Sequence, residues 1–193
     1  NCKSRGDGYL EGNGYAVTWA LGHLIGQQEP EELDERYAKW RTQDLPILPD
    51  DIPLKIIRGR KQQFTSIKKL ICAKDTDSLV CATDAGREGE LIFRWIYAYA
   101  KCDKPVQRLW ISSMTDEAIQ KGFSDLRSDA EYEGLFQSAK SRAWADWVVG
   151  MNATRAYTVR YGTLLSIGRV QTPTLAFLVR RQKQIDDFVS EPY

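Results

Sequence analysis

The chain has 193 residues, of which 42% are hydrophobic and 27% are charged, and its formal net charge is +1. This composition is typical of an ordinary soluble globular protein of one or two domains that is long enough to bury a core. No apolar run reaches the roughly 18 residues of a membrane helix, and the N-terminus does not resemble a signal peptide. The cysteines form no C-x-x-C pair, so we expect reduced thiols of a cytosolic protein at Cys2, Cys72, Cys81 and Cys102.

The first part of the chain alternates between two kinds of pattern. Three short runs of β-branched and aromatic residues predict strands at 14–19, 79–83 and 106–111. The segment 45–53 is interrupted by proline and predicts an ordered loop. Amphipathic patterns predict helices at 61–74 and 87–101. This order of helix and strand predicts βαβ units around a parallel sheet.

Helical patterns dominate the rest of the chain. Thr115 is a predicted N-cap, because acidic residues follow it in the first turn of a helix. A long helix is predicted at 133–162, and a final helix is predicted to begin at Thr172–Pro173, as an N-cap and N1 pair. The change of pattern predicts an α/β domain at 1–112 and a helical domain at 113–193.

The segment CATDAGREGELI ends a predicted strand with Asp84 and begins the next helix near Glu88. Ligands bind at the carboxyl ends of parallel strands, so the two carboxylates are expected to face one point. Two hard oxygen ligands suit Mg²⁺, while Gly86 and Gly89 admit a phosphodiester and Arg87 neutralises it. The alternative is structural: Asp84 caps the helix and Glu88 complements its dipole.

The second part of the chain is basic, since residues 140–185 contain eight Lys or Arg and one acidic residue. Aromatic residues are interleaved with these charges, at Trp144, Trp147, Tyr157 and Tyr161. The combination suits a groove for a polyanion with stacking platforms for unpaired bases. The alternative is that the aromatic residues belong to the core and the charges to a solvated face. The turn 166–172 places polar donors just ahead of a helix N-terminus, which is a natural anion site.

The stretch TDAGREGE resembles the acidic motif of Toprim domains in type IA DNA topoisomerases, Asp-x-Asp-Arg-Glu-Gly, at Asp84, Arg87, Glu88 and Gly89. Gly86 stands where the family has its second aspartate. The resemblance implies an α/β Toprim fold, Rossmann-like with a parallel sheet, followed by an α-helical region. It also implies Mg²⁺ as the cofactor, with Asp84 and Glu88 as the metal ligands.

Three further stretches resemble the same family. SIGRVQTPT is similar to its S-x-G-R-V-Q-T-P signature, SRAWADWVVGMNATRA to its R-x-D-W-x-x-G-x-N-x-T-R-A pattern, and GYAVTWALGHL to a strand and its G-H-L turn. The resemblance implies catalytic roles for His23, Glu88 and Arg169. It implies DNA contacts by Arg87, Arg142, Arg155, Ser166, Ile167, Gly168, Arg169, Val170, Gln171 and Thr172.

The resemblance is closest to the bacterial topoisomerase III branch, and it implies a reaction. A tyrosine cleaves single-stranded DNA, holds the 5′ phosphate covalently and lets the ends rejoin, with Mg²⁺ and without ATP. The family's first Toprim glutamate is expected before Asn1 and its nucleophilic tyrosine after Tyr193, so we expect a piece of a larger enzyme that binds metal and DNA but relaxes nothing. None of the nine tyrosines here stands in the nucleophile's context.

The resemblance also implies a setting. We expect a monomer that binds single-stranded DNA and no membrane, in the cytoplasm at the bacterial nucleoid. Two alternatives stay open: another Toprim enzyme, such as a primase or a nuclease, and a non-catalytic DNA-binding module. The SIGRVQTPT turn argues against the first alternative, because those enzymes have no reason to carry it.

Overall fold

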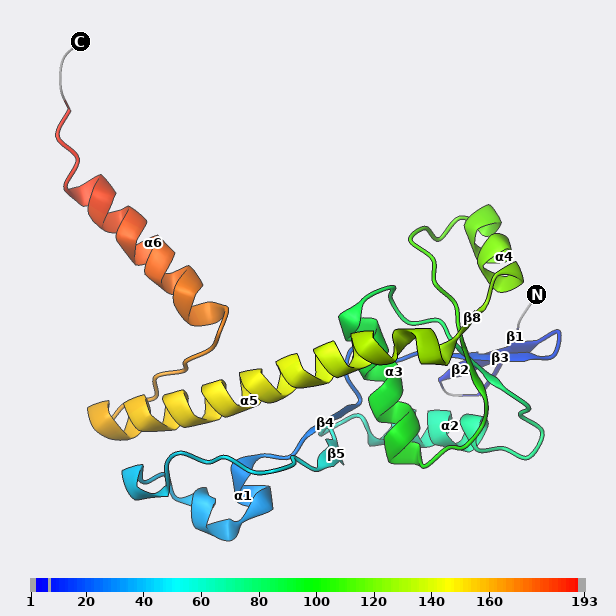
Figure 1. Cartoon of the computed structure of the whole chain (residues 1–193), viewed down its shortest axis with the longest axis horizontal. Coiled ribbons are helices and arrows are strands. Elements are labelled where there is room, and N and C mark those ends of the chain that lie inside the picture. Colours follow the sequence, from blue (N-terminus) through cyan, green and yellow to red (C-terminus); the bar gives the residue numbers. More distant parts are fainter. Residues whose placement is uncertain (1–2, 7, 191–193) are drawn as a thin grey trace. The chain divides into compact units, whose positions relative to one another are not determined.

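The computed structural model describes residues 3–6 and 8–190, so Cys2 and Tyr193 lie outside the described residues. The chain forms two compact units, each built from segments that are distant in the sequence. Unit 1 comprises Asn1–Gln28 and Ile52–Ser141, and unit 2 comprises Glu29–Asp51 and Arg142–Tyr193. Figure 1 labels their helices and strands. The domain division at residue 112 stays a prediction.

The first sheet of unit 1 is an antiparallel meander of β1 (Lys3–Gly6), β2 (Tyr9–Gly12) and β3 (Tyr15–Thr18). The predicted strand at 14–19 therefore exists as β3, but it does not join a parallel sheet. The reason is local. Asn13 and Gly14 connect β2 to β3 with positive φ angles of 50° and 77°, and an Asn-Gly pair in this conformation makes a tight hairpin turn.

Two further sheets complete unit 1. β4 (Ile25–Gln27) and β5 (Leu54–Ile56) form an antiparallel pair. β6 (Leu79–Cys81) and β7 (Val106–Arg108) pair in parallel, and β8 (Arg127–Ser128) pairs antiparallel with β7. Helix α3 (Arg87–Ala100) connects β6 to β7, so the predicted βαβ unit over residues 79–111 is confirmed, although each strand is shorter than predicted.

Helices α2 (Lys61–Ile71) and α3 of unit 1 each bury an apolar face, whereas α4 (Asp116–Ser124) buries no residue. α2 buries Phe64 and Ile67, and the ring of Phe64 meets Tyr99 of α3 edge-on at 5.4 Å between centroids. α3 buries its apolar stripe of Leu91, Trp95 and Ile96. α4 begins at the predicted N-cap Thr115, whose hydroxyl accepts a hydrogen bond from the Ala118 amide. Residues 82–86 connect the end of β6 to the start of α3.

Unit 2 is helical. It contains α1 (Pro30–Leu33), the 3₁₀ turns η1 (Glu35–Ala38) and η2 (Thr42–Asp44), residues 45–51 of the predicted proline-interrupted loop, and α6 (Gln171–Asp186). Another 3₁₀ turn, η3 (Asp129–Tyr132), leads into the long helix α5 (Glu133–Tyr161), which begins in unit 1 and continues in unit 2. Figure 1 shows α5 as the longest helix of the chain.

The last helix begins earlier than predicted. α6 starts at Gln171 with Val170 as its N-cap, so Thr172 is not the cap and Pro173 is the third residue of the helix rather than the first. The Thr172 amide already donates to the Gly168 carbonyl, at 3.1 Å, and Pro173 is tolerated because amides of the first turn have no partner within the helix.

Two expectations drawn from the composition concern the cysteines and membrane-spanning helices. Cys72, Cys81 and Cys102 are free thiols, and Cys81 is buried at the end of β6, where burial raises the pKa of its thiol. Within residues 3–6 and 8–190, no helix combines the length and the apolar character needed to cross a membrane.

Candidate functional site

The acidic turn, residues 82–89, leads from the end of β6 into α3. Its shape depends on hydrogen bonds between its two ends: the Thr83 hydroxyl donates to the Gly89 carbonyl at 2.8 Å, and the Gly86 amide donates to the Asp84 carbonyl at 2.8 Å. A Cβ atom on Gly89 would lie 2.2 Å from the Asp84 carbonyl oxygen, so only glycine fits there. The glycine therefore serves the turn itself, by letting the helix pack against Asp84.

Gly86 behaves differently from Gly89. It is the N-cap of α3 with φ 178° and ψ 176°, an extended conformation that any residue adopts, and a Cβ atom there would meet nothing within 4 Å. The backbone thus does not require a glycine at position 86. The position where the resembling family has an aspartate is open to a side chain.

His23 and Glu88 meet across the unit, although they are 65 residues apart in the sequence. His23 Nε2 lies 2.5 Å from Glu88 Oε1, and the His23 ring packs 5.7 Å from the Trp95 ring of α3. The other ring nitrogen, Nδ1, is buried and has no hydrogen-bond partner among the described residues. The Glu88 side chain keeps 67% of its surface exposed. Two separately predicted catalytic residues, His23 and Glu88, are therefore brought together at the start of α3.

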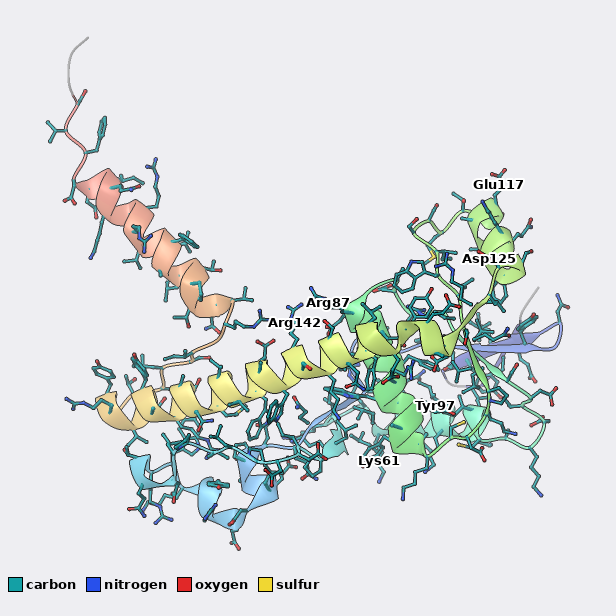
Figure 2. The ribbon with its side chains drawn as sticks, in the orientation of Figure 1. Lys61, Arg87, Tyr97, Glu117, Asp125 and Arg142 are labelled. Atoms are coloured by element: carbon teal, nitrogen blue, oxygen red, sulfur yellow. The ribbon has the colours of Figure 1, made fainter. Side chains whose placement is uncertain are left out.

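The other two charged residues of the turn are exposed. The carboxylate of Asp84 has no hydrogen bond or ion pair within the part of the chain that the structure describes, whereas its backbone carbonyl is bonded. Arg87 opens α3, and Figure 2 shows its side chain at the first turn of that helix. Asp84 does not act as a side-chain cap, because the N-cap of α3 is Gly86 and no side-chain cap bond forms. The alternative interpretation of Asp84 as a helix cap is thus wrong.

The acidic turn offers two carboxylates to a metal ion. Among the described residues, no group of three or more His, Cys, Asp or Glu side chains is placed to hold a metal ion. Two exposed carboxylates, from Asp84 and Glu88, remain at the strand end. Such a donor set fits Mg²⁺ because that ion takes one or two protein carboxylates and fills its other positions with water and phosphate oxygens.

A buried arginine beneath the turn was missed in the sequence. Arg108, the last residue of β7, has no exposed surface. Its guanidinium donates to four backbone carbonyls, those of Cys81, Thr83, Asp84 and Leu109, at 2.7–3.1 Å. The only sequence signal was a charged residue inside the strand-like run VQRLWI.

A buried carboxylate balances that charge. Glu90 of α3 is also without exposed surface, and its Oε2 lies 3.2 Å from Arg108 Nε, while its Oε1 accepts from Arg94 Nε at 2.9 Å. Arg94 continues the network to Asp129 at 2.9 Å and to Glu133 at 3.3 Å. Desolvation raises the pKa of Asp129, against the opposing effect of Arg94. The chain thus places an ionic network under the acidic turn.

The predicted anion site in unit 2 is the turn 166–172, which precedes and enters α6. Most of its residues are exposed, namely Ser166, Arg169, Val170, Gln171 and Thr172, whereas Ile167 and Gly168 are half-buried. The Gly168 amide donates to the Thr172 hydroxyl at 3.1 Å, which closes the turn.

Arg169 is already engaged by a carboxylate. Its Nε lies 2.5 Å from Asp146 Oδ1 and its terminal nitrogen 3.1 Å from Oδ2, so the pair is bidentate. The hydrogen bond from Arg169 lowers the pKa of the Asp146 carboxyl. Arg142, one turn earlier on α5, lies 3.8 Å from the same carboxylate. Figure 2 shows Arg142 on α5. Asp146 therefore holds two of the predicted DNA contacts.

The helix α5 fastens two loops to itself through the polar residues of its NATRA segment. Thr154 accepts from the Ile167 amide at 2.9 Å and donates to the Ile167 carbonyl at 3.3 Å. Asn152 pairs in the same two-point manner with the amide and the carbonyl of Ile47, at 2.6 and 2.9 Å. The two side chains position the backbone of the loops at Ile47 and Ile167. Their own hydrogen-bond donors are therefore largely used within the chain.

Arg155 and the aromatic residues divide between core and surface. Arg155 is 4% exposed, donates to Glu31 at 2.9 Å and to the Tyr37 carbonyl at 2.7 Å, and lies over the Trp40 ring. This geometry favours a structural role for it. Trp147 is buried, which confirms the core interpretation, but that interpretation is wrong for Trp144, which is 44% exposed.

The comparisons with known proteins match the chain in two consecutive parts. Residues 5–114 match the family profile described as "Toprim domain", and residues 130–193 match the profile described as "DNA topoisomerase". Proteins named DNA topoisomerase 3 from Bacillus subtilis (strain 168) and from Bacillus licheniformis are 52% and 50% identical to it over 192 residues. These matches cover 100% of this chain and 26% of each relative, so the chain spans about a quarter of their length.

A solved structure shows the same fold. The full-length topoisomerase I of Thermotoga maritima superposes with a TM-score of 0.61, at 22% sequence identity. The superposition covers 88% of this chain and 26% of that protein. Most of this chain therefore has the fold of a part of that protein.

Proposed function

The chain belongs to the Toprim family, and from that premise we propose that it is the part of a type IA DNA topoisomerase that binds Mg²⁺ and single-stranded DNA. The whole enzyme would cleave one DNA strand through a 5′-phosphotyrosine link and rejoin it, without ATP. The chain alone would bind its ligands and relax nothing, because none of its nine tyrosines stands in the context of the family's nucleophile.

One observation carries the proposal: the pairing of His23 with Glu88 beside the exposed carboxylate of Asp84. A helix N-terminus, two carboxylates and an imidazole at one strand end are groups that bind and orient a phosphodiester with its counter-ion. When bound there, Mg²⁺ would neutralise charge on the transferring phosphate. His23 holds Glu88 in one orientation, and Arg87 offers a cation to the same phosphate.

The second set of contacts lies in unit 2 at the turn 166–172. Exposed donors from Ser166, Gln171 and Thr172 stand beside the N-terminus of α6, where backbone amides favour an anion. Arg169 and Arg142 add positive charge, and Asp146 fixes the direction of both guanidinium groups. We propose that DNA phosphates bind these donors, with Arg169 in the catalytic set, while Arg155 supports the loop beneath them.

The proposed function is tested by DNA and metal binding in this chain. Fluorescence anisotropy with a labelled oligothymidylate should show binding that weakens steeply as salt rises, since phosphate contacts release counterions. Mn²⁺, a paramagnetic substitute for Mg²⁺, should broaden the NMR signals of Asp84 and Glu88 first, and Asp84→Asn should reduce that broadening. Lack of binding to the oligonucleotide at low salt would refute the DNA part, and uniform broadening would refute the metal part.

A plasmid assay separates this chain from the whole enzyme. The chain with Mg²⁺ is expected to leave negatively supercoiled plasmid unchanged over hours, with the full-length Bacillus subtilis relative as the positive control. Relaxation by the chain alone would contradict the proposal that the nucleophile is missing from it.

A further inference from the structure

Arg108 is fully buried beneath the acidic turn, as is Glu90, and most of its hydrogen bonds go to backbone carbonyls of one segment. One terminal nitrogen donates to the carbonyls of Cys81, Thr83 and Leu109, and the other donates to the Asp84 carbonyl at 2.7 Å. Three of these four carbonyls belong to the end of β6 and the turn that follows it. A single side chain from β7 thus holds three peptide groups of the segment that carries Asp84.

Two aromatic rings also contact the guanidinium. Its carbon atom lies 5.1 Å from the centroid of the Trp110 ring and 5.9 Å from that of Tyr132, and these two rings stack on each other at 4.8 Å. The face of an aromatic ring attracts a cation placed over it. The aromatic pair therefore adds to the contacts that hold the Arg108 side chain in place.

The positive charge of Arg108 is tolerated in the interior because a buried carboxylate, Glu90, lies beside it. Glu90 reaches Arg108 Nε at 3.2 Å and Arg94 Nε at 2.9 Å, so the carboxylate is shared between two cations. Removing one member of such a network leaves an uncompensated charge in a desolvated site, which is strongly destabilising. An apolar residue would fill this space without the cost of burying a charge. We therefore expect the ionic network to have a role beyond packing.

We propose that Arg108 is a positioning residue for the candidate metal site, holding the backbone of the acidic turn so that the carboxylates of Asp84 and Glu88 meet one ligand. The metal part of this inference rests on the proposed function, whereas the positioning of the turn does not. Lysine has no fork of donors and reaches fewer carbonyls, so Arg108→Lys keeps the charge and loses the positioning.

The test uses the whole chain without metal. Amide hydrogen exchange reports the bonds of the turn, from Gly86 to Asp84 and from Glu90 to Gly86. In Arg108→Lys these amides are expected to exchange at least about tenfold faster, as local openings do when supporting bonds are lost, while the amides of α2 keep their rates. Unchanged exchange at Gly86 and Glu90 would overturn the proposal.

Arg94→Lys is the matched control, because Arg94 shares Glu90 with Arg108 but donates to no carbonyl of the turn. It is expected to leave the exchange of Gly86 unchanged. An equal effect of both variants would assign the result to the charge network and overturn the positioning role.

Two further measurements complete the test. Should Arg108→Lys fail to fold, NMR of the unchanged chain decides: the guanidinium protons of Arg108 should exchange slowly and show contacts to the turn, and rapid exchange would overturn the proposal. If Arg108→Lys does fold, titration of this variant with Mn²⁺ should give weaker, less selective broadening than titration of Arg94→Lys. If the unchanged chain bound no Mn²⁺, the proposed function would fail while the exchange result still judged Arg108.

Discussion

The backbone of Asp84 occupies the space that a side chain at Gly89 would need. A Cβ atom on Gly89 would lie 2.2 Å from the Asp84 carbonyl oxygen and 2.7 Å from its amide nitrogen, both well inside contact distance. The first turn of α3 can therefore pack against the end of β6 only through glycine. This contact brings Asp84 and Glu88 to the same end of the strand.

Gly89→Ala is expected to destabilise the chain by about 1–3 kcal/mol, the usual cost of forcing extra atoms into a packed site. Urea unfolding followed by circular dichroism measures the change. Gly86→Ala is the control, since a Cβ atom there meets nothing within 4 Å, and it should leave the free energy of unfolding unchanged or slightly higher. Equal destabilisation by both variants would contradict the difference in free space around the two glycines.

Gly86→Asp is expected to strengthen divalent-metal binding several-fold. Position 86 is extended and open, so an aspartate fits and adds a carboxylate to those of Asp84 and Glu88. Mn²⁺ titration by NMR gives the midpoint, and Gly86→Asn provides the same shape without the charge. If the asparagine variant bound Mn²⁺ as tightly as the aspartate variant, the added charge would not be the cause.

Arg169→Ala is expected to weaken binding to a single-stranded oligonucleotide and to reduce the salt slope by about one unit, as loss of one phosphate contact does. Anisotropy measured from low to moderate salt gives both quantities. Lys121→Ala, on α4 in unit 1, removes one positive charge elsewhere and should leave the slope unchanged. Unaltered affinity in Arg169→Ala would remove this residue from the DNA-binding set.

The pair of Asp146 and Arg169 should make a pH-dependent contribution to stability. The hydrogen bond from Arg169 lowers the pKa of Asp146 below its ordinary value of 3.8 in the folded chain. A depressed folded pKa means that the contribution is present above the unfolded pKa and is lost as the pH falls through the folded one. Both side chains are exposed, so screening by solvent keeps this contribution small.

Urea unfolding of the unchanged chain and of Asp146→Asn at several pH values measures this contribution. The difference between the two should be constant from pH 7 to pH 5 and should shrink below pH 4. A difference that grew on acidification would contradict the direction of the pKa shift.

Asn152→Ala is expected to destabilise unit 2 by about 1–3 kcal/mol, because the buried backbone groups of Ile47 lose their partners. Hydrogen exchange of the Ile47 amide provides the local measurement, and it should accelerate while the Ile57 amide, bonded to Leu24 in unit 1, keeps its rate. If hydrogen exchange of both amides accelerated equally, the substitution would have destabilised the whole chain rather than unit 2 alone.

Local chemistry was readable from the sequence where the cause was itself local. Thr115 is an N-cap because a hydroxyl and the next turn suffice for the bond, and the βαβ unit follows from strand, helix and strand patterns in order. The strand predicted at 14–19 belongs to an antiparallel hairpin, whose turn is formed by Asn13 and Gly14. The predicted start of α6 lies two residues too late, because the hydroxyl of Thr172 favours an N-cap there whereas the N-cap of the helix is Val170.

The sequence by itself determined the Toprim resemblance, the residues of the acidic turn and the basic character of residues 140–185, because each depends on residues that are close together in the chain. Only the tertiary structure decided which distant groups meet: His23 with Glu88, and Arg108 with the carbonyls beneath Asp84. It also decided that Arg155 is buried while Arg169 is exposed, although both are arginines of family motifs. Such pairings depend on how strands and helices pack, and no local pattern of charge or hydrophobicity encodes that packing.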